Sequence, residues 1–351
     1  MNDATLPLPP PGKSGWPWTG VGPAFAPTRS DGSPWPRISI VTPSYNQGPF
    51  IEETIRSVLL QGYPNLEYWV IDGGSTDNTV EVVEKYAPWL AGWVSERDRG
   101  QTDALNKGWA RCTGEWLAWL NSDDLYTPGA LAALVEFATQ NPQVDVAYGT
   151  CDLIDEQSRF IARAVPPAWD FGQELSENFI SQPSTFMRRA VVEALGGVNE
   201  ARHFAFDYEL WLQAALHGFR FALVPGPPLA AFRLWEVSKT ESSAEKFVEE
   251  SLDILEEVFA DPRLPAELRA VRPRALSGAW RAAAFGCYRA GRMEAARRCL
   301  REMAALDPSR RADPAVLSLW ARSFLGSRPN AAARRLKRAL SRARHGSTNN
   351  G

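Results

Sequence analysis

The sequence predicts an α/β fold, in which a mainly parallel sheet with helices on both faces is followed by a helical C-terminal region. Three observations support this prediction. Short β-branched runs alternate with helix-period segments from residue 37 to about residue 150, polar residues follow the strand-like runs, and the pattern beyond Thr240 is almost wholly helical. Strands separated by helices of this length imply right-handed crossovers between parallel strands.

The individual strands and helices are predicted from the spacing of apolar residues and from the residues that typically begin or end a helix. Strands are expected over residues 38–43, 66–72, 92–96, 115–121 and 145–149. Helices are expected over residues 51–61, 77–86, 104–111, 185–195 and 206–217. A further helix is expected to start at Thr127 and Pro128, because threonine suits an N-cap and proline suits the first helical turn.

Composition divides the 351 residues into three regions. Residues 1–36 are rich in proline and tryptophan, which predicts an extended arm because proline fixes φ and lacks an N–H. We expect its tryptophans to pack on the α/β domain, residues 37–240. Residues 241–345 are expected to be helical and include one tetratricopeptide-like hairpin.

The charge and cysteine patterns exclude several classes of protein. A net charge of -3 gives no reason to expect nucleic-acid binding, and the four separated cysteines form neither a C-x-x-C pair nor a disulfide framework. No signal-peptide pattern is present, so we expect a cytoplasmic protein. Residues 331–345 carry six Arg or Lys and no acid. This segment is either a solvated tail or a peripheral contact with the inner face of the plasma membrane.

Polar clusters follow the first four expected strands. They are Pro43 to Asn46, Asp72 to Ser75, Glu96 with Asp98, and Asn121 to Asp124. Ligands of an open parallel sheet bind outside the carboxyl ends of its strands, so the four clusters are expected to face one crevice. The usual dinucleotide, P-loop and nucleophile-elbow motifs are absent from the sequence, which leaves a crevice rich in carboxylates.

The adjacent Asp123 and Asp124 allow two interpretations. They form a polar turn before the next helix, or they hold a divalent cation. Two like charges repel unless a cation lies between them and an anion, and hard oxygen ligands suit Mn²⁺ or Mg²⁺ bridging to a diphosphate. The second interpretation therefore predicts a nucleoside-diphosphate ligand.

Two segments resemble the catalytic domain of glycosyltransferase family 2. They are TPSYNQGPFIEETIRSVLLQGYPNLEYWVIDGGSTDNT and DRGQTDALNKGWARCTGEWLAWLNSDD, and the resemblance extends from about Ile38 to Thr240. It implies a GT-A fold and inverting transfer from a nucleotide sugar. It also implies the nucleotide-pocket residues Thr42, Pro43, Tyr45 and Asn46, Asp72 as acceptor for the base, Asp123 near the ribose and Asp124 on the metal.

The resemblance also implies a general base. FDYELW matches an acidic motif of the family, which makes Asp207 the candidate, although Phe206 replaces the glutamate common before it. An inverting displacement needs such a carboxylate, separate from the one at the metal. The alternative for Asp207 is a helix N-cap. FRLWEVSKT matches the loop that closes on the diphosphate, with Trp235 where many relatives have histidine.

Asp103 and Asn106 are expected to orient the sugar, with the alternative that they are ordinary polar residues of a helix. The resemblance implies a nucleotide-diphosphate sugar donor, with UDP favoured, and a saccharide or glycan-lipid acceptor. A nucleotidyltransferase is a second reading, but it needs a basic glycine-rich loop, and PSYNQGPF has no basic residue. The third is a non-catalytic sugar-nucleotide-binding or scaffold protein acting through its helical C-terminus.

Overall fold

The structure, a computed structural model, describes residues 6–235 and 243–325. The chain divides into two units between Trp235 and Glu236. The expected end of the α/β domain at residue 240 lies outside the described residues.

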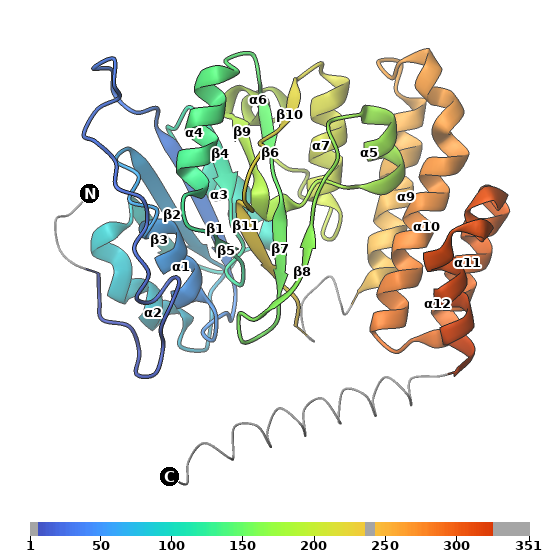
Figure 1. The fold of residues 1–351 in the computed structure, drawn as a ribbon, viewed down its shortest axis with the longest axis horizontal. Helices are drawn as coiled ribbons and strands as arrows, with labels where there is room; N and C mark the ends of the chain where they lie inside the picture. Colours follow the sequence, from blue (N-terminus) through green and yellow to red (C-terminus); the bar gives the residue numbers. More distant parts are fainter. Residues whose placement is uncertain (1–5, 236–242, 326–351) are drawn as a thin grey trace, which may run out of the picture. The chain divides into compact units, whose positions relative to one another are not determined.

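A seven-stranded sheet is the centre of the first unit (Figure 1), with the strand order β10-β6-β9-β4-β1-β2-β3. All neighbours pair in parallel except β9, which is antiparallel to both β4 and β6. The predicted, mainly parallel sheet is therefore confirmed. Its strands are β1 (Ile38–Ser44), β2 (Leu66–Asp72), β3 (Gly92–Ser95), β4 (Trp116–Trp119), β6 (Val146–Tyr148), β9 (Thr185–Arg188) and β10 (Phe221–Leu223).

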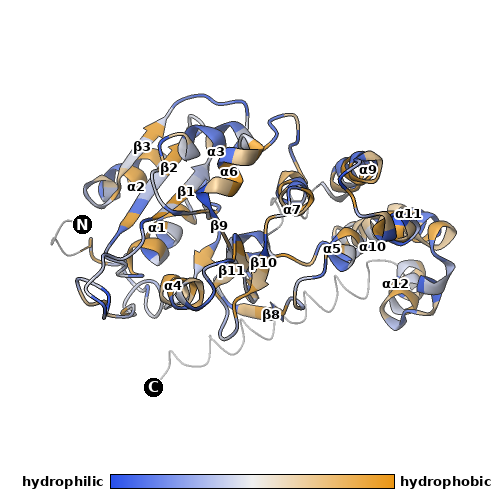
Figure 2. Ribbon diagram, turned by 90° about the horizontal axis from the view of Figure 1, so that it is seen from above, coloured by the Kyte–Doolittle hydropathy of each residue, from blue (hydrophilic) through white to orange (hydrophobic). Residues whose placement is uncertain are grey.

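Helices cover both faces of this sheet, as predicted (Figure 2). Along β1, Ile38 and Ile40 pack in one apolar cluster with α1, α2 and α4, whereas Val41 packs in another with α3, α6 and α7. This alternation is the period of two expected for a strand buried on both faces. The helices of this unit are α1 (Ile51–Leu59), α2 (Thr79–Tyr86), α3 (Gln101–Trp109), α4 (Ala130–Gln140), α5 (Phe171–Glu177), α6 (Arg189–Leu195) and α7 (Phe206–Leu216).

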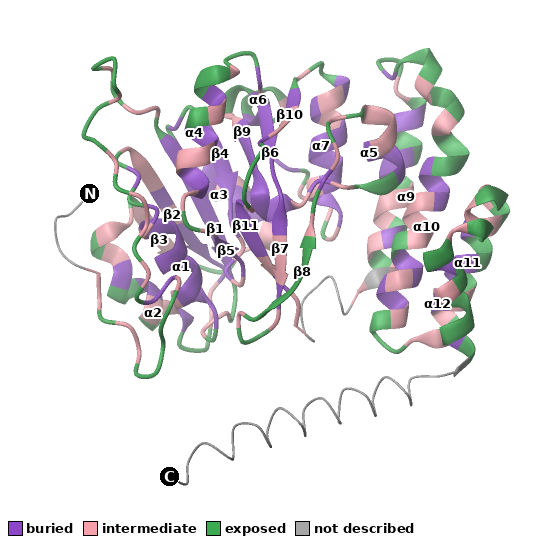
Figure 3. Ribbon diagram, in the orientation of Figure 1, coloured by how far each residue is buried: buried purple, intermediate pink, exposed green. Residues whose placement is uncertain are grey.

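A smaller, four-stranded sheet was not expected from the sequence. It has the order β5-β11-β7-β8 and places the end of the first unit next to the segment after β4. Its strands are β5 (Leu125–Tyr126), β7 (Cys151–Ile154), β8 (Phe160–Ala164) and β11 (Ala230–Arg233). The edge strand β8 is mostly exposed (Figure 3).

Two predicted helix boundaries are wrong. The helix expected over residues 185–195 begins only at Arg189, because Thr185–Arg188 fill the gap between β6 and β4 as an antiparallel strand. The helix expected to start at Thr127 begins at Ala130, since the Thr127 hydroxyl donates to the Pro228 carbonyl instead of capping the helix.

The N-terminal arm packs on this unit, as the sequence predicts. Within its described part the arm has neither helix nor strand, and Trp16 Nε1 donates to the carbonyl of Tyr126 at 2.8 Å. The buried Arg56 of α1 donates to the carbonyls of Pro17 and Trp18 at 3.0 and 2.9 Å. These bonds satisfy backbone oxygens that the proline-rich arm cannot pair in a sheet.

The second unit is helical and has its own apolar core. The tight turn between α10 and α11 contains Gly291, at a φ of 78°, and forms the expected hairpin. Its helices are α9 (Ala244–Ala260), α10 (Arg272–Arg289), α11 (Met293–Leu306) and α12 (Pro314–Leu325). Of the helices described in either unit, none combines the length and apolar character that crossing a membrane requires. The basic segment 331–345 lies outside the described residues.

Candidate active site

The carboxyl ends of β1, β2 and β3 bring polar residues to one level of the sheet. Ser44 pairs with Asp72, and Asp72 pairs with Ser95, in the strand registers. The polar segments that follow these positions therefore start side by side. This is the arrangement expected at the ends of parallel strands.

Asp72 is buried, and donors from two loops hold its carboxylate. The N–H groups of Gly74 and Ser75 lie 3.1 and 2.9 Å from Oδ2, and the hydroxyl of Ser95 lies 2.7 Å from the same atom. The Ser75 hydroxyl donates to Oδ1. A nucleotide base that bonds to Asp72 has to share or replace one of these donors.

The four residues expected in the nucleotide pocket after β1 differ in their environments. Thr42 and Pro43 are buried, and the Thr42 hydroxyl lies 2.9 Å from that of Tyr68. Asn46 has a left-handed φ of 52°, and its Oδ1 accepts a backbone N–H from the loop after β2 at 2.8 Å. Tyr45 is 59% exposed. Of these four, Tyr45 therefore offers the open aromatic surface.

The Asp123-Asp124 turn places its two carboxylates in different surroundings. Asp124 is fully buried, where Oδ1 accepts the backbone N–H of Arg233 at 2.9 Å and Oδ2 accepts the amide of Asn121 at 3.2 Å. Burial, and then the charge of Asp123, raise the pKa of Asp124 well above its ordinary value. Asp123 is partly exposed. In this geometry both oxygens of Asp124 already accept hydrogen bonds, and its role as the metal ligand stays a prediction.

Arg233 lies behind this turn, and the sequence analysis did not identify it. Its side chain is fully buried, with Nε donating to the Asp123 carbonyl at 2.7 Å and Nη2 lying 2.9 Å from Glu53 Oε2. Nη1 donates to the Ser158 hydroxyl at 2.9 Å, and the guanidinium lies over the ring of Phe50. The available signal was a charged residue inside an apolar strand, since a buried arginine needs partners.

Trp235 bonds directly to the turn. Its indole Nε1 donates to Asp123 Oδ2 at 2.8 Å, and its ring packs edge-to-face on Phe50 with centroids 5.0 Å apart. An indole N–H is a donor only and does not ligate a metal. Trp235 therefore orients Asp123 and is not itself a metal ligand.

A chain of side-chain amides extends from the turn across the strand ends. Asn121 Nδ2 donates to Asp124 and also to Gln182 Oε1 at 3.0 Å, and Gln101 Nε2 donates to Asn121 Oδ1 at 2.7 Å. Gln182 in turn donates to the carbonyl of Trp119 at 2.8 Å. Each amide thus fixes the orientation of the next, from α3 to the segment before β9.

The first turn of α7 lies beside the end of β4. The rings of Phe206 and Trp211 pack on Trp119, with centroids 6.1 and 5.7 Å away. Asp207 lies inside the helix rather than at the N-cap, so the capping alternative is wrong. The packing brings the helical turn that carries Asp207 to the strand end that the Asp123 turn follows.

Glu174 of α5 is a second carboxyl group near this helical turn. It is fully buried and its Oε2 accepts the N–H of Phe179 at 2.9 Å, while the N–H of Ile180 also lowers the pKa of the carboxyl group. Among the residues that the structure describes, its Oε1 has no hydrogen-bond partner. Burial raises the pKa of Glu174 to about 8, and the negative charge of Asp207 contributes to this shift. No pattern in the sequence points to Glu174, because nothing local marks a glutamate as buried.

Asp103 and Asn106 fasten α3 to its surroundings. Arg99 donates to Asp103 through a guanidinium nitrogen at 2.8 Å and its own N–H at 3.0 Å, and this pair lowers the pKa of Asp103 to about 2. The Asn106 amide donates to Val198 O at 2.9 Å and accepts Val198 N–H at 3.0 Å. These contacts give both residues a structural role beside the predicted one.

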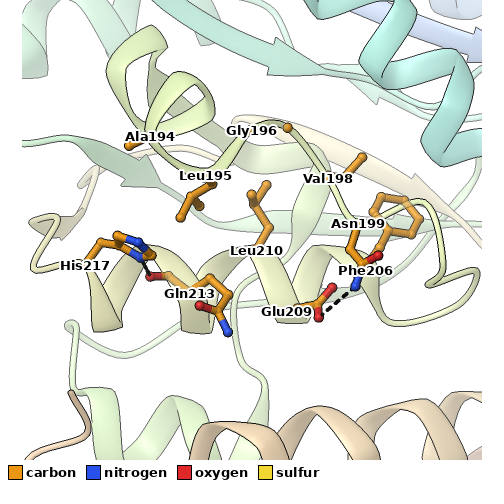
Figure 4. Close-up of a pocket in the computed structure, with 11 residues that line it drawn as sticks. Ala194, Leu195, Gly196, Val198, Asn199, Phe206, Glu209, Leu210, Gln213 and His217 are labelled. Carbon is orange, nitrogen blue, oxygen red and sulfur yellow. Dashed lines mark hydrogen bonds between the residues drawn. The ribbon is translucent and has the colours of Figure 1, made fainter. Parts of the chain in front are cut away.

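A groove of about 320 Å³ lies between α6 and α7 (Figure 4). Two of the residues that line the groove bond to each other: Asn199 donates to Glu209 Oε1 at 3.2 Å. The residues lining it are Ala194, Leu195, Gly196, Gly197, Val198, Asn199, Phe206, Glu209, Leu210, Gln213 and His217. Phe206, in the first turn of α7, therefore lines one end of the groove next to Asn199 (Figure 4).

The sheet order and the carboxylate-bearing strand ends define a transferase fold of the GT-A type. Residues 39–196 match the family model "Glycosyl transferase family 2". This part of the chain is therefore similar to that family.

Curated relatives share part of their length with this chain. An uncharacterised glycosyltransferase of Nostoc sp. is 32% identical over 41% of this chain and 44% of its own length. A PGL/p-HBAD biosynthesis glycosyltransferase of Mycobacterium bovis is 30% identical over 47% of this chain and 64% of its own. The chain thus spans about half the length of these relatives.

Two solved structures share the fold. A mannosyltransferase of Pyrobaculum calidifontis, in complex with GDP-Man and Mn²⁺, has a TM-score of 0.54 and 24% identity, covering 83% of this chain and 86% of its own. TarS of S. aureus, residues 1–349 in complex with UDP-GlcNAc, has a TM-score of 0.52 and 18% identity, covering 78% and 91%. Both likenesses support the assignment of the fold.

Removing either member of the Arg233–Glu53 pair is expected to destabilise the first unit strongly. Arg233→Met and Glu53→Gln should each lower the free energy of unfolding by about 3 kcal/mol, because each leaves a buried polar partner uncompensated. The double variant should lose less than the sum. Urea unfolding of all four proteins measures the coupling, and strictly additive losses would show that the pair does not act as a unit.

Glu174 is expected to make stability fall as pH rises. Its pKa is raised from 4.5 to about 8 on folding, so the folded state favours the protonated form. This contribution is complete below pH 4.5 and declines until about pH 8. The free energy of unfolding of the wild type, relative to Glu174→Gln, should fall by several kilocalories per mole across this range in urea titrations. Glu177→Gln, an exposed change on the same helix, should keep most of this fall, because the charge of Glu177 is only a minor cause of the raised pKa of Glu174.

Proposed function

We propose that this chain is an inverting glycosyltransferase that moves a sugar, specifically a hexose, from a nucleotide-diphosphate sugar to an acceptor hydroxyl. The observation that carries the proposal is the packing of the first turn of α7, with Asp207, against the end of β4, which leads into the Asp123 turn. An inverting displacement needs these two carboxylates on separate elements. The family match favours this reading over a non-catalytic scaffold.

The donor is proposed to bind along the ends of β1 and β2. Tyr45 offers its exposed ring for stacking on the base, Asp72 accepts from the base, and Asn46 shapes the loop together with Thr42 and Pro43. The two structural neighbours hold GDP-Man and UDP-GlcNAc. These complexes support a nucleotide-sugar donor, among which we favour a UDP-sugar.

A divalent cation, Mn²⁺ or Mg²⁺, is proposed to bind at Asp123. In the part of the chain that the structure describes, no three His, Cys, Asp or Glu side chains are grouped to hold a metal. One carboxylate is compatible with these cations, which take further ligands from diphosphate and water. Trp235 occupies Oδ2 of Asp123, and Oδ1 is the atom proposed to face the cation. Bound there, the cation would neutralise charge on the leaving diphosphate.

Asp207 is proposed to act as the general base. As the acceptor oxygen forms its bond to the anomeric carbon, the bond from that carbon to the diphosphate oxygen breaks and the acceptor proton passes to Asp207. The direct displacement inverts the anomeric centre and needs no covalent intermediate. Asp103 and Asn106, which fix α3, are proposed to orient the sugar.

The acceptor is proposed to be a saccharide or a glycan-lipid in cell-surface polysaccharide or glycan biosynthesis. A named role in PGL/p-HBAD biosynthesis for the mycobacterial relative supports this class. We further propose that the enzyme works in the cytoplasm, with residues 331–345, six of them Arg or Lys, in peripheral contact with the inner membrane face.

Asp207→Asn is expected to lower kcat about a thousandfold while leaving the KM for the donor nearly unchanged, because an amide does not accept the proton. Release of the nucleoside diphosphate from UDP- and GDP-sugars, with a panel of saccharide acceptors, measures both constants. Glu193→Gln, an exposed change on α6, is the matched control. Wild-type activity in Asp207→Asn would remove the proposed base.

Asp123→Asn is expected to weaken Mn²⁺ binding about tenfold or more. Calorimetric titration of Mn²⁺ in the presence of UDP measures this without relying on turnover. Asp124→Asn should instead lower the free energy of unfolding by about 2 kcal/mol, because the new NH2 group faces one of the two buried donors, Arg233 N–H or Asn121 Nδ2, that Asp124 now accepts. The opposite result, a metal defect confined to Asp124→Asn, would restore the assignment made from the sequence.

A further inference from the structure

Glu174 has a feature that the proposed reaction leaves unexplained. A buried polar atom without a partner costs about 1–3 kcal/mol, and native proteins contain few of them. Glu174 Oε1 is such an atom, on a side chain with no exposed surface. Its other oxygen already accepts the N–H of Phe179 at 2.9 Å.

The backbone around Glu174 is tied to the helical turn that carries Asp207. Tyr208, the residue after Asp207, donates its hydroxyl to the carbonyl of Leu175 at 2.9 Å and lies 3.3 Å from that of Glu174. Tyr208 is buried, so this bond is shielded from water. The helices α5 and α7 are therefore joined next to Glu174 and Asp207.

The charged and titratable groups acting on Glu174 come from three elements. They are Asp207 and Tyr208 of α7, Tyr148 of β6 and Glu177 of its own helix. Burial raises the pKa of both tyrosines above the ordinary value, so both stay neutral. Burial also raises the pKa of Glu174 to about 8, and both nearby acids add to the shift. Near neutral pH, the Glu174 carboxyl group therefore keeps its proton.

We propose that Glu174 is a positioning residue for Asp207, supporting the first turn of α7 through α5 and presenting Oε1 as a hydrogen-bond donor toward the candidate base. This inference rests on the proposed function of Asp207. Glu174 keeps its own proton throughout, while Asp207 takes the proton of the acceptor. Hydrogen bonds of catalytic groups are often long before substrate binds and shorten in the complex. The unpartnered oxygen of the free protein is therefore the atom that gains a partner in the reaction.

The test compares Glu174→Gln, Glu174→Ala and the exposed control Glu177→Gln in the full chain. Wild-type kcat should fall on the alkaline side with a midpoint near pH 8, as Glu174 ionises. Glu174→Gln stays neutral, so it should lack this fall. Glu174→Ala should lower kcat about tenfold to a hundredfold at neutral pH with little change in the donor KM, since a small displacement of a catalytic group has this effect. Glu177→Gln should keep the wild-type kcat at neutral pH and the alkaline fall, with a slightly lower midpoint because the charge of Glu177 is a minor cause of the raised pKa of Glu174.

Infrared difference spectra supply a readout that does not depend on turnover or on the stability of the alanine variant. Between about pH 6 and about pH 9, the wild type should lose a protonated-carboxyl band that Glu174→Gln lacks and Glu177→Gln retains. Two results would overturn the proposal. One is a fall of kcat at alkaline pH in Glu174→Gln that equals the fall in the wild type. The other is a protonated-carboxyl band that is the same in Glu174→Gln as in the wild type. The inactivity of Asp207→Asn tests the proposed function separately, so the two ideas can fail independently.

Discussion

The burial of one cation, Arg233, is the constraint on which the site depends. A guanidinium removed from water is stable only when its donors are satisfied, and here the partners come from three separate segments. They are the carboxylate of Glu53 in α1, the Asp123 carbonyl after β4, and the turn between β7 and β8, including Ser158. These segments cannot move independently without leaving a buried charge unpaired. The turn that presents Asp123 is thereby held rigid before any ligand binds, which is the condition for electrostatic catalysis.

Each of the two candidate carboxylates of the reaction lies near a second, more deeply buried carboxyl group. Partly exposed Asp123 is followed by fully buried Asp124, and partly exposed Asp207 lies near fully buried Glu174. In both places burial raises the pKa of the inner carboxyl group. Burial also raises the pKa of Asp123, which keeps some exposed surface. The inner groups therefore serve as hydrogen-bonding supports, and the outer groups keep the exposed surface that a ligand or a substrate needs.

Local pattern was sufficient for the large sheet but not for the parts of the site that depend on distant contacts. The apolar period of β1, β2 and β4 fixes strands buried on both faces, and the ends of parallel strands predict where Asp72 and Asp123 gather. The site residues and the strand that the sequence does not predict lack this regular spacing of apolar residues. Glu53 and Arg233 are 180 positions apart, and β9 is a strand only because β4 and β6 leave a gap for it. Burial of Asp124 likewise depends on β11, which arrives late in the chain.

Charge balance gives a physical reason for a cation in the proposed reaction. A diphosphate that approaches Asp123 is repelled unless positive charge compensates it. Three cationic side chains near this edge are already engaged: Arg233 with Glu53, Arg99 with Asp103 and Glu200, and Lys107 with Glu96 and Asp103. Using any of them would break an existing ion pair, and for the buried Arg233 the cost would be several kilocalories per mole. A divalent ion shared between Asp123 and the diphosphate supplies the charge without that loss, and it leaves Asp207 free of the leaving group and ionised for the acceptor.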